Sequence, residues 1–370
     1  MLGPAENTIS EALSGFDFGG EVAGALRYGA GHINDTFCVY TQQKNGDGKR
    51  FILQRINTDT FTDPAGLMEN ICGVTDYLRG IIEKNGGDPA RETMTVLRTK
   101  DGKTYYTDRE QGAWRVYPFV EGTICLQAAE TPELFCASGK AFGRFQHLLA
   151  GYPAATLHET IVQFHDTENR LANFRAALAA DKCGRAKDVQ PETAFVLARA
   201  ADCSKAMQAL RDGVLPLRVT HNDTKLNNVL IDKATGEGIC VIDLDTVMPG
   251  LSINDFGDSI RFGANHSAED ERDLSQVNFD LDLFDIYTKG YFAGAGSALT
   301  DAEKAYMPWG AKLMTLECGI RFLTDYLDGD HYFKVHRDGQ NLDRCRTQFK
   351  LVRDMEEHWA EMEAVIRRYA

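Results

Sequence analysis

No apolar run in the 370-residue chain reaches the length that spans a bilayer, which argues against a membrane protein. Its first segment, MLGPAENTISEALSG, has no basic stretch followed by an apolar one and therefore does not resemble an export signal. The nine cysteines are odd in number and include no C-x-x-C pair, so neither a zinc ribbon nor a disulfide framework is indicated. We therefore expect a cytoplasmic protein with reduced thiols and no membrane partner.

Basic residues are outnumbered, because 40 Lys and Arg stand against 54 Asp and Glu, and the formal net charge is −14. Binding to nucleic-acid phosphates needs the opposite balance, so no nucleic-acid partner is expected. With 43% hydrophobic residues in a chain of this length, two lobes are the expected organisation. The sequence carries no signal for an oligomer, and a monomer is the expected state.

The part of the chain from Gly24 to Val120 has a mainly β pattern that one helix interrupts. Asp63-Pro64 is a typical helix start, and apolar residues then recur at helical spacing as far as Ile81. We expect five strands around this one helix, with a hairpin turn at 45–48. The strand-like segments are 37–40, 51–56, 93–98, 104–107 and 114–120.

Beyond residue 120 the pattern changes to helices. One short β-like island, 218–245, interrupts them, and functional loops are commonly placed on such islands. We therefore divide the chain into an N-terminal lobe, 1–120, and a mainly helical C-terminal lobe, 121–370. The helical patterns are 134–150, the alanine-rich 173–213, 278–294 and 351–370.

The island contains HNDTKLNN (221–228), an apolar strand, a turn, and a second apolar strand that ends at Asp243. Phosphoryl transfer needs one carboxylate to accept or orient the proton of the attacking hydroxyl, and oxygen ligands for Mg²⁺. Asp223 suits the first task, whereas Asn228 and Asp243 suit the second because Mg²⁺ prefers hard oxygen donors. His221 is expected to be structural. The alternative, polar residues that only cap strands, needs several coincidences at once.

Further charged residues accompany this segment. Lys225 can neutralise the charge that develops on the transferred phosphate, although a solvated surface lysine is an equal alternative. Asp245 is a candidate second metal ligand, or a support for the first. Asp255-Phe256-Gly257 spells a protein-kinase metal motif but follows Pro249-Gly250 rather than an apolar strand. We therefore expect Asp255 and Asp258 to hold the catalytic loop by hydrogen bonds or to cap a helix.

A glycine-rich segment, YGAGHINDTF (28–37), lies between two strand-like segments. Gly29 and Gly31 can let backbone amides approach phosphates, so both are candidate nucleotide-binding residues. A hairpin without a ligand is the ordinary alternative, because Asn34 occupies the last glycine position of a full G-x-G-x-x-G.

The third strand has no lysine to bind the α and β phosphates. Gln54 is the candidate at that position, and its neighbour Arg55 points to the opposite face of the strand. The anchor therefore stays open, as does Glu69 as its helical partner. Pro118, Phe119 and Val120 are the candidate hinge whose backbone pairs with adenine, and a simple connecting strand is the alternative.

Asp223, Asn228 and Asp243 together resemble the H-x-D-x-x-x-x-N, strand, Asp arrangement of the kinase-like superfamily. The fold this implies is an α+β, two-lobed protein-kinase-like fold, with a five-stranded antiparallel N-lobe carrying one helix and a mainly helical C-lobe. Nearly the whole chain also resembles the bacterial N-acetylhexosamine 1-kinases, in the aminoglycoside phosphotransferase and choline-kinase branch. The segments that carry this likeness are GxGHIN-x-T (29–36), FILQ-x-x-N (51–57), GAWRVYPF (112–119), TIVQFHDT (160–167), RVTHNDTKLNN (218–228), IDLDT-x-MPG (242–250), DFGDSIRFGA (255–264) and ECG-x-RFL-x-DYL-x-GD-x-YF (317–333).

The resemblance implies transfer of the γ-phosphate of ATP, with Mg²⁺, to the anomeric hydroxyl of N-acetylglucosamine or N-acetylgalactosamine. By matched positions Asp223 is the general base, and Asn228 and Asp243 are the metal ligands. Arginine and histidine can donate to hydroxyls or to an acetamido carbonyl, and aromatic rings can cover a pyranose ring. The sugar-contacting residues expected on these grounds are His32, Phe262, Arg321 and Tyr332.

Simpler interpretations stay open for the acceptor side. Arg321 can form a surface pair with Asp325 one helical turn later, and Tyr332 can belong to the core. Another small-molecule kinase, acting on an aminoglycoside, a choline-like amine or a methylthioribose-like sugar, is the first functional alternative. A nucleotide-binding pseudokinase is the second, because the strand lysine is missing.

Overall fold

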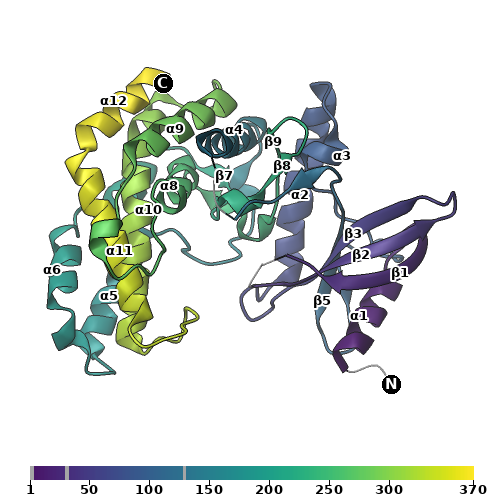
Figure 1. Cartoon of the computed structure of the whole chain (residues 1–370), viewed down its shortest axis with the longest axis horizontal. Coiled ribbons are helices and arrows are strands. Elements are labelled where there is room, and N and C mark those ends of the chain that lie inside the picture. The colour runs from purple at the N-terminus through teal and green to yellow at the C-terminus, as the bar shows by residue number, and fades with distance from the viewer. Residues whose placement is uncertain (1–3, 30–32, 128–130) are drawn as a thin grey trace.

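The computed structural model of the chain describes residues 4–29, 33–127 and 131–370. A five-stranded antiparallel sheet forms one end of the molecule, and a helical assembly forms the other (Figure 1). This confirms the expected α+β, two-lobed fold, whereas the lobe boundary at residue 120 stays a prediction. In the order β1-β2-β3-β5-β4, the sheet contains β1 (Gly20–Arg27), β2 (Asp35–Gln43), β3 (Gly48–Arg55), β4 (Tyr106–Thr107) and β5 (Ala113–Pro118).

Three helices accompany the sheet where one was expected. The predicted one, α2 (Pro64–Lys84), begins where the Asp63 side chain accepts a hydrogen bond from the Gly66 amide at 3.0 Å. The others are α1 (Pro4–Ser14) and the single turn α3 (Pro89–Glu92). A small core lies with α1 against the sheet and includes Ala12, Phe16, Leu53, Trp114 and Val116.

The strand expected over 93–98 is wrong. This segment is extended, but its one backbone bond to the sheet joins the Leu97 amide to the Val116 carbonyl at 2.9 Å. An extended segment becomes a strand only when a neighbour offers a continuous ladder, and β4 already pairs with β5 through Tyr106 and Trp114. The fifth strand is instead β1, which lies at one edge of the sheet.

The helical part surrounds two small sheets. The expected island forms β7 (Arg218–Thr220), β8 (Val229–Asp232) and β9 (Gly238–Val241), which pair with β10 (Met248–Gly250) and β6 (Thr123–Ile124). The helices are α4 (Pro132–Leu148), α5 (Thr167–Ala180), α6 (Gln190–Ala198), α7 (Lys205–Arg211), α8 (Ser252–Gly263), α9 (Leu281–Ala295), α10 (Asp301–Asp328), α11 (Gln340–Glu357) and α12 (Trp359–Tyr369).

The helix expected over 351–370 is two helices. The chain leaves helical geometry at His358, and α12 starts again at Trp359. This break brings the Trp359 ring against Trp309 on α10, with ring centroids 4.9 Å apart. A tertiary contact between aromatic rings therefore accompanies a change of direction that the helical periodicity alone does not reveal.

Two helices of this part cross in close backbone contact. A Cβ atom added at Gly143 on α4 would overlap the Tyr291 carbonyl oxygen, and one at Gly290 on α9 would overlap the Cys136 carbonyl oxygen. Glycine therefore permits the close approach. Gln146, three residues after Gly143 on α4, donates a hydrogen bond from its side-chain amide to the Asp255 carboxylate at 2.9 Å. The crossing of the two helices therefore helps to position Asp255.

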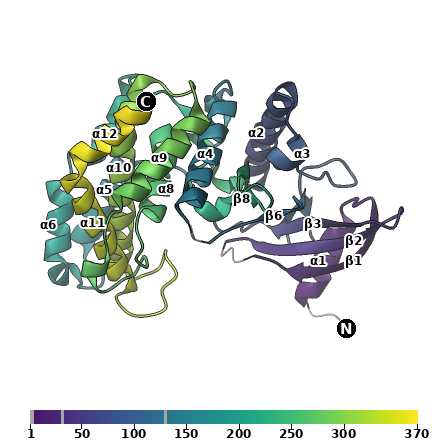
Figure 2. The same cartoon turned by 45° about the horizontal axis from the view of Figure 1, so that its top comes forward.

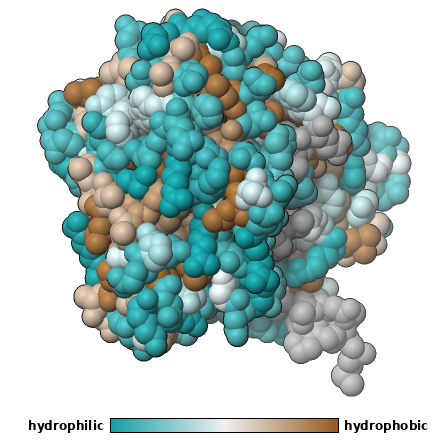
Figure 3. Space-filling view, turned by 60° about the vertical axis from the view of Figure 1, so that its left-hand side comes forward, coloured by the Kyte–Doolittle hydropathy of each residue, from teal (hydrophilic) through white to brown (hydrophobic). Residues whose placement is uncertain are grey.

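The two ends of the molecule are joined through α2 and the β6–β8–β9 sheet, which lies between α4 and the large sheet in Figure 2. Buried Asn70 on α2 donates to the carbonyls of His158 at 2.8 Å and Val247 at 3.0 Å, both beyond residue 120. Hydrophilic side chains cover most of the face of the helical part that Figure 3 shows. No helix in the described ranges is long and apolar enough to cross a membrane.

Candidate active site

The catalytic loop runs from β7 to the short 3₁₀ helix Leu226–Asn228 and brings three predicted residues together. The Asp223 carboxylate is 2.7 Å from Lys225 Nζ and accepts a hydrogen bond from Asn228 Nδ2 at 3.2 Å. The same Asn228 amide donates to the Asp223 carbonyl at 2.8 Å. Burial lowers the pKa of Lys225, but the charge of Asp223 outweighs it and the pKa of this ammonium is raised. Lys225 is therefore a partner of Asp223 rather than a solvated surface lysine.

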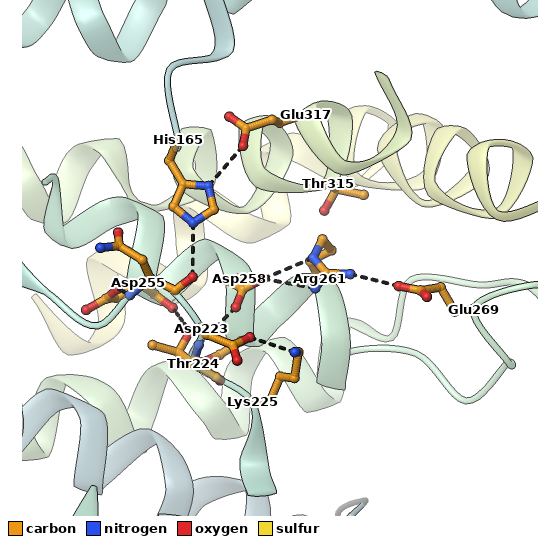
Figure 4. Close-up of polar contacts among 12 residues, drawn as sticks. His165, Asp223, Thr224, Lys225, Asp255, Asp258, Arg261, Glu269, Thr315 and Glu317 are labelled. Atoms are coloured by element: carbon orange, nitrogen blue, oxygen red, sulfur yellow. Dashed lines mark hydrogen bonds and ion pairs between the residues drawn. The ribbon is translucent and has the colours of Figure 1, made fainter. Parts of the chain in front are cut away.

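Two aspartates of α8 hold this loop by hydrogen bonds, as expected from the sequence (Figure 4). Asp255 accepts hydrogen bonds from the amides of His221 at 2.9 Å and Asn222 at 2.8 Å. Asp258 accepts one from the Thr224 amide at 2.9 Å. Burial raises the pKa of Asp255 in spite of these donors. The aspartate of the Asp255-Phe256-Gly257 sequence therefore holds the catalytic loop by hydrogen bonds.

Asp243 lies two residues after the end of β9 and adopts a left-handed backbone conformation with φ of 59°. The Ile242 amide donates to the Asn228 carbonyl at 2.9 Å, which places the end of β9 beside the catalytic loop. Within the described ranges the Asp243 carboxylate accepts no hydrogen bond and forms no ion pair, and its side chain is open to the cleft. Burial of its surroundings and the charges of Asp245 and Asp223 raise the pKa of Asp243 to about 6.

A divalent cation fits this donor set. Mg²⁺ usually takes one or two protein carboxylates and completes its octahedron with water and phosphate oxygens. The carboxylate of Asp243 and the side-chain oxygen of Asn228 are hard donors of that kind. Among the residues that the structure describes, no group of three or more His, Cys, Asp or Glu side chains forms a closed metal site.

Asp245 lies differently from Asp243, because both of its oxygens are engaged by the N-terminal part of the chain. One oxygen is 2.5 Å from Arg115 Nη1, and the other accepts a hydrogen bond from Asn34 Nδ2 at 2.6 Å. Asp245 is 3% exposed and Arg115 is 1% exposed, so the pair is shielded from water. The predicted role of Asp245 as a metal ligand stays untested, and the structure places it as the partner of Arg115.

Arg115 is a residue that sequence reasoning missed. It lies on β5 directly opposite Gln54 on β3, and its Nε donates to Gln54 Oε1 at 3.0 Å. Arg55 is on the other face, with its guanidinium 5.9 Å from the Trp114 ring, and Glu69 is exposed and pairs with His158 at 2.8 Å. The available signal was a single arginine inside the otherwise uncharged and buried strand AWRVYP.

A cavity of about 560 Å³ lies between the large sheet and the catalytic loop. Phe119 at its edge packs against Tyr28, with centroids 5.8 Å apart, and lies 3.8 Å below the Arg50 guanidinium. Gly31 lies outside the described residues. The predicted nucleotide and metal residues that line this cavity are Gly29, Gln54, Pro118, Phe119, Val120, Asn228 and Asp243, joined by Arg115.

Arg321 and Tyr332 lie together at the end of α10, where Arg321 Nη2 donates to the Tyr332 hydroxyl at 3.2 Å. Tyr332 is 68% exposed and so is not a core residue. Asp325 does not pair with Arg321 in the described ranges, because its carboxylate accepts hydrogen bonds from the backbone amides of residues 331–333. Both simpler interpretations of these residues therefore fail.

The acceptor candidates do not all line one cavity. Arg321 and Tyr332 line a cavity of about 500 Å³ together with Arg170. Phe262 lines a different cavity, of about 520 Å³, which includes Thr224 of the catalytic loop. His32 lies outside the described residues.

This fold is shared with solved small-molecule kinases of low sequence identity. The chain is similar to a microcompartment-associated aminopropanol kinase at 16% identity and a TM-score of 0.62, over 97% of this chain and 98% of that one. It is similar to a choline kinase from Cryptosporidium parvum Iowa II at 13% identity and a TM-score of 0.55, over 99% of each chain. An amicoumacin kinase in complex with AMP-PNP, Ca²⁺ and Ami matches at 16% identity and a TM-score of 0.57, over 95% and 93%.

These likenesses define a two-lobed fold of the kinase-like class. A model of the phosphotransferase enzyme family (APH) also matches residues 25–287, which is more than half of the chain. The chain therefore belongs to the phosphotransferase enzyme family.

Proposed function

We propose that this phosphotransferase is an ATP- and Mg²⁺-dependent kinase that phosphorylates the anomeric hydroxyl of N-acetylhexosamines. The observation that carries the phosphotransfer part is that the Asp223 carboxylate, held by Lys225 and Asn228, lies near enough to act electrostatically on the unpartnered Asp243 carboxylate, which lines the cavity. The sugar part rests on the sequence resemblance and on the residues near Arg321.

The cavity between the sheet and the loop is the proposed nucleotide site. Pro118, Phe119 and Val120 would bind adenine, and the backbone near Gly29 would approach the phosphates. The solved amicoumacin kinase of similar fold is in complex with AMP-PNP and Ca²⁺, which supports the proposal of a nucleotide and a divalent cation for this chain. When bound, ATP supplies the phosphoryl group and Mg²⁺ stabilises its negative charge.

Arg115 is the proposed replacement for the missing strand lysine. Three described cations line the cavity: Arg50 is engaged by Glu121, Lys233 is the second, and Arg115 alone lies opposite Gln54. Asp245 holds the Arg115 guanidinium and Gln54 binds its Nε, and this almost fully buried side chain lines the cavity, where its positive charge would attract a phosphate. This assignment favours an active kinase over a pseudokinase.

Asp223 is the proposed general base. Its carboxylate would accept the proton of the acceptor hydroxyl as the bond to phosphorus forms, and Lys225, 2.7 Å from this carboxylate, would neutralise charge that develops on the transferred phosphate. Asn228 fixes the carboxylate from the other side at 3.2 Å. The base is therefore oriented before the acceptor arrives.

The charge of the acceptor region favours a neutral sugar over an amine. Arg170 and Arg321 line the same cavity as Tyr332, whereas Lys182 there is paired with Asp328 at 2.9 Å and the Asp325 carboxylate already accepts three backbone hydrogen bonds. An ammonium group of a choline-like or aminoglycoside acceptor beside Tyr332 would meet the two guanidinium groups of Arg170 and Arg321, which repel it. Arginine and tyrosine donors instead suit hydroxyl groups and an acetamido carbonyl.

A coupled ATP assay over a panel of acceptors tests the proposal. The panel contains N-acetylglucosamine, N-acetylgalactosamine, glucose, choline, aminopropanol and kanamycin, with and without Mg²⁺. Turnover with N-acetylhexosamines, and ³¹P NMR that places the phosphate on the anomeric carbon, are expected. Turnover of the amines alone would reject the sugar assignment while leaving the phosphotransferase intact. Asp223→Asn is the control for background ATPase.

A further inference from the structure

The buried histidine His165 contacts both the catalytic loop and α10, and neither contact belongs to the machinery described above. Its Nδ1 is 2.9 Å from Glu317 Oε1 on α10, and its Nε2 is 3.1 Å from the Asn222 carbonyl oxygen (Figure 4). Its side chain is 7% exposed and that of Glu317 is 1% exposed. The next residue, Asp166, caps α5, because its side chain accepts a hydrogen bond from the Asn169 amide at 3.0 Å, and this bond does not involve His165.

Both partners of the ring are acceptors only. A carboxylate and a carbonyl oxygen have no hydrogen to give, so each ring nitrogen must carry a proton to make both bonds. The geometry therefore calls for an imidazolium. Burial lowers the pKa of His165, but the charge of Glu317, the bonds to Glu317 and Asn222, and the charge of Asp258 outweigh it and raise the pKa.

The charged groups on the elements packed around His165 and Glu317 are consistent with a protonated, positively charged His165 ring. Glu317 also accepts a hydrogen bond from Thr167 Oγ1 at 2.9 Å, and the cations Arg170 and Arg321 help to hold its pKa below the usual range although burial opposes them. Asp258, on α8, adds a second negative charge near the ring, although Arg261 pairs with it at 3.0 Å. The imidazolium therefore contacts one carboxylate, on α10, and has a second, Arg261-paired carboxylate on α8 nearby.

The carbonyl that His165 holds belongs to a special position in the loop. Asn222 has a left-handed conformation with φ of 64°, and its amide and side chain are bound by Asp255 and the Thr246 carbonyl, each at 2.8 Å. The Asn222 carbonyl is part of the peptide unit that leads into Asp223, so fixing it fixes the direction of the base. On the other side, Glu317 lies one helical turn before Arg321.

We infer that His165 is a positioning residue, whose charged ring fixes the Asp223 peptide against the α10 turn that carries Arg321. When the ring loses a proton, the remaining one stays on Nδ1, because a lone pair there would face the Glu317 carboxylate. Nε2 then releases the Asn222 carbonyl, and the base loses its alignment. This inference rests on the proposed function only in taking Asp223 as the base.

The test combines two substitutions with the wild type. His165→Gln is expected to lower kcat about tenfold or more at neutral pH without changing the affinity for ATP, because a misplaced base costs alignment rather than nucleotide binding. Wild-type kcat should fall as the pH rises through the raised pKa of His165. Glu317→Gln should remove this alkaline fall, because its amide can donate to Nδ1 and leaves the proton on Nε2.

A matched control is His158→Gln. His158 lies seven residues before His165 and also pairs with a glutamate, Glu69, at 2.8 Å. Both of these side chains are exposed and neither forms a bond to the catalytic loop, so wild-type kinetics and pH dependence are expected for His158→Gln. Kinetics use N-acetylglucosamine as the acceptor, and ATP turnover to water is measured in parallel. Histidine ¹⁵N NMR of the wild type should show both nitrogens of His165 protonated at neutral pH.

Several outcomes would overturn the inference. A neutral His165 ring at neutral pH contradicts it, as does a folded His165→Gln variant with wild-type kcat and pH profile. If His165→Gln does not fold, the pH dependence of kcat in Glu317→Gln is the deciding measurement. A fall in kcat at alkaline pH equal to that of the wild type would reject the inference. Failure of every panel acceptor would reject the proposed function alone, because the NMR result and the water reaction still report on His165.

Discussion

Asp243 and Asp255 both lie beside the catalytic loop, but they differ in the number of hydrogen bonds that the protein donates to their carboxylates. Asp255 on α8 is buried and receives three hydrogen bonds, from two loop amides and Gln146. Asp243 after β9 has no donor in the described ranges, and its pKa is raised to about 6 by burial of its surroundings and by Asp245 and Asp223. A carboxylate that the protein saturates supports a loop, whereas one left without donors needs a cation from outside.

The largest expected difference between Asp243 and Asp255 appears when each carboxylate is removed. Asp243→Ala is expected to abolish Mg²⁺-dependent ATP turnover and to leave the fold intact, because no protein donor loses a partner. Asp255→Ala should lower the free energy of unfolding by about 2–5 kcal/mol, because two loop amides lose their buried acceptor. Kinetics and urea unfolding of both variants measure this. If Asp255→Ala alone lost metal dependence, the two assignments would have to be exchanged.

Asp223 lies between these extremes, with one cationic and one amide neighbour. Asp223→Asn should keep the shape but cannot accept a proton, so kcat is expected to fall by about 10² or more, with ATP and sugar affinities nearly unchanged. A loose transition state would make proton removal late and the loss smaller. A kcat within a few-fold of the wild type would falsify the assignment of Asp223 as the base.

Arg321 and Asp325 on α10 offer a second comparison between a residue expected to bind substrate and one that only holds the fold. Arg321→Ala should raise KM for the sugar by roughly one to two orders of magnitude with a smaller effect on kcat, because hydrogen bonds present in both the ground and the transition state are lost. Asp325→Ala should instead lower the melting temperature, because three amides of the 331–333 loop lose their acceptor. Equal sugar kinetics in Arg321→Ala with lost stability would contradict the assignment.

The smallest expected effect is on stability in the absence of substrate. Mg²⁺ at a hundredfold excess over its dissociation constant should stabilise the wild type by about 2.7 kcal/mol, as any ligand that binds only the folded state does. Asp243→Asn should lose this response, and Asp255→Asn should retain it. Thermal unfolding with and without Mg²⁺ measures the difference. An equal response in wild type and Asp243→Asn would place the cation elsewhere.

The sequence predicts the elements whose signals are local. The two-lobed α+β fold is confirmed, and Asp243 was found because it follows an apolar strand at the right distance from Asn228. The expected strand over 93–98 failed because its pattern is local but its hydrogen-bond partners are not. The break at His358 likewise accompanies contacts that helical periodicity does not contain.

The unpredicted parts of the site depend on partners that are far apart in the chain. Arg115 pairs with Asp245, and His165 pairs with Glu317, across folded elements that no spacing rule connects. The residues expected around the sugar were chosen by resemblance, and the structure separates Phe262 from Arg321 and Tyr332 into different cavities. Composition and spacing cannot supply such pairings, because they arise only when the helices pack.

The crossing of α4 and α9 also limits how this chain can vary. Gly143 and Gly290 each face a carbonyl oxygen of the opposite helix, so even one added methyl group would push the helices apart. Because Gln146, less than one turn from Gly143, holds Asp255, such a displacement would be transmitted to the catalytic loop. Related chains that keep this crossing must therefore keep glycine at both positions, however far their acceptor pockets have diverged.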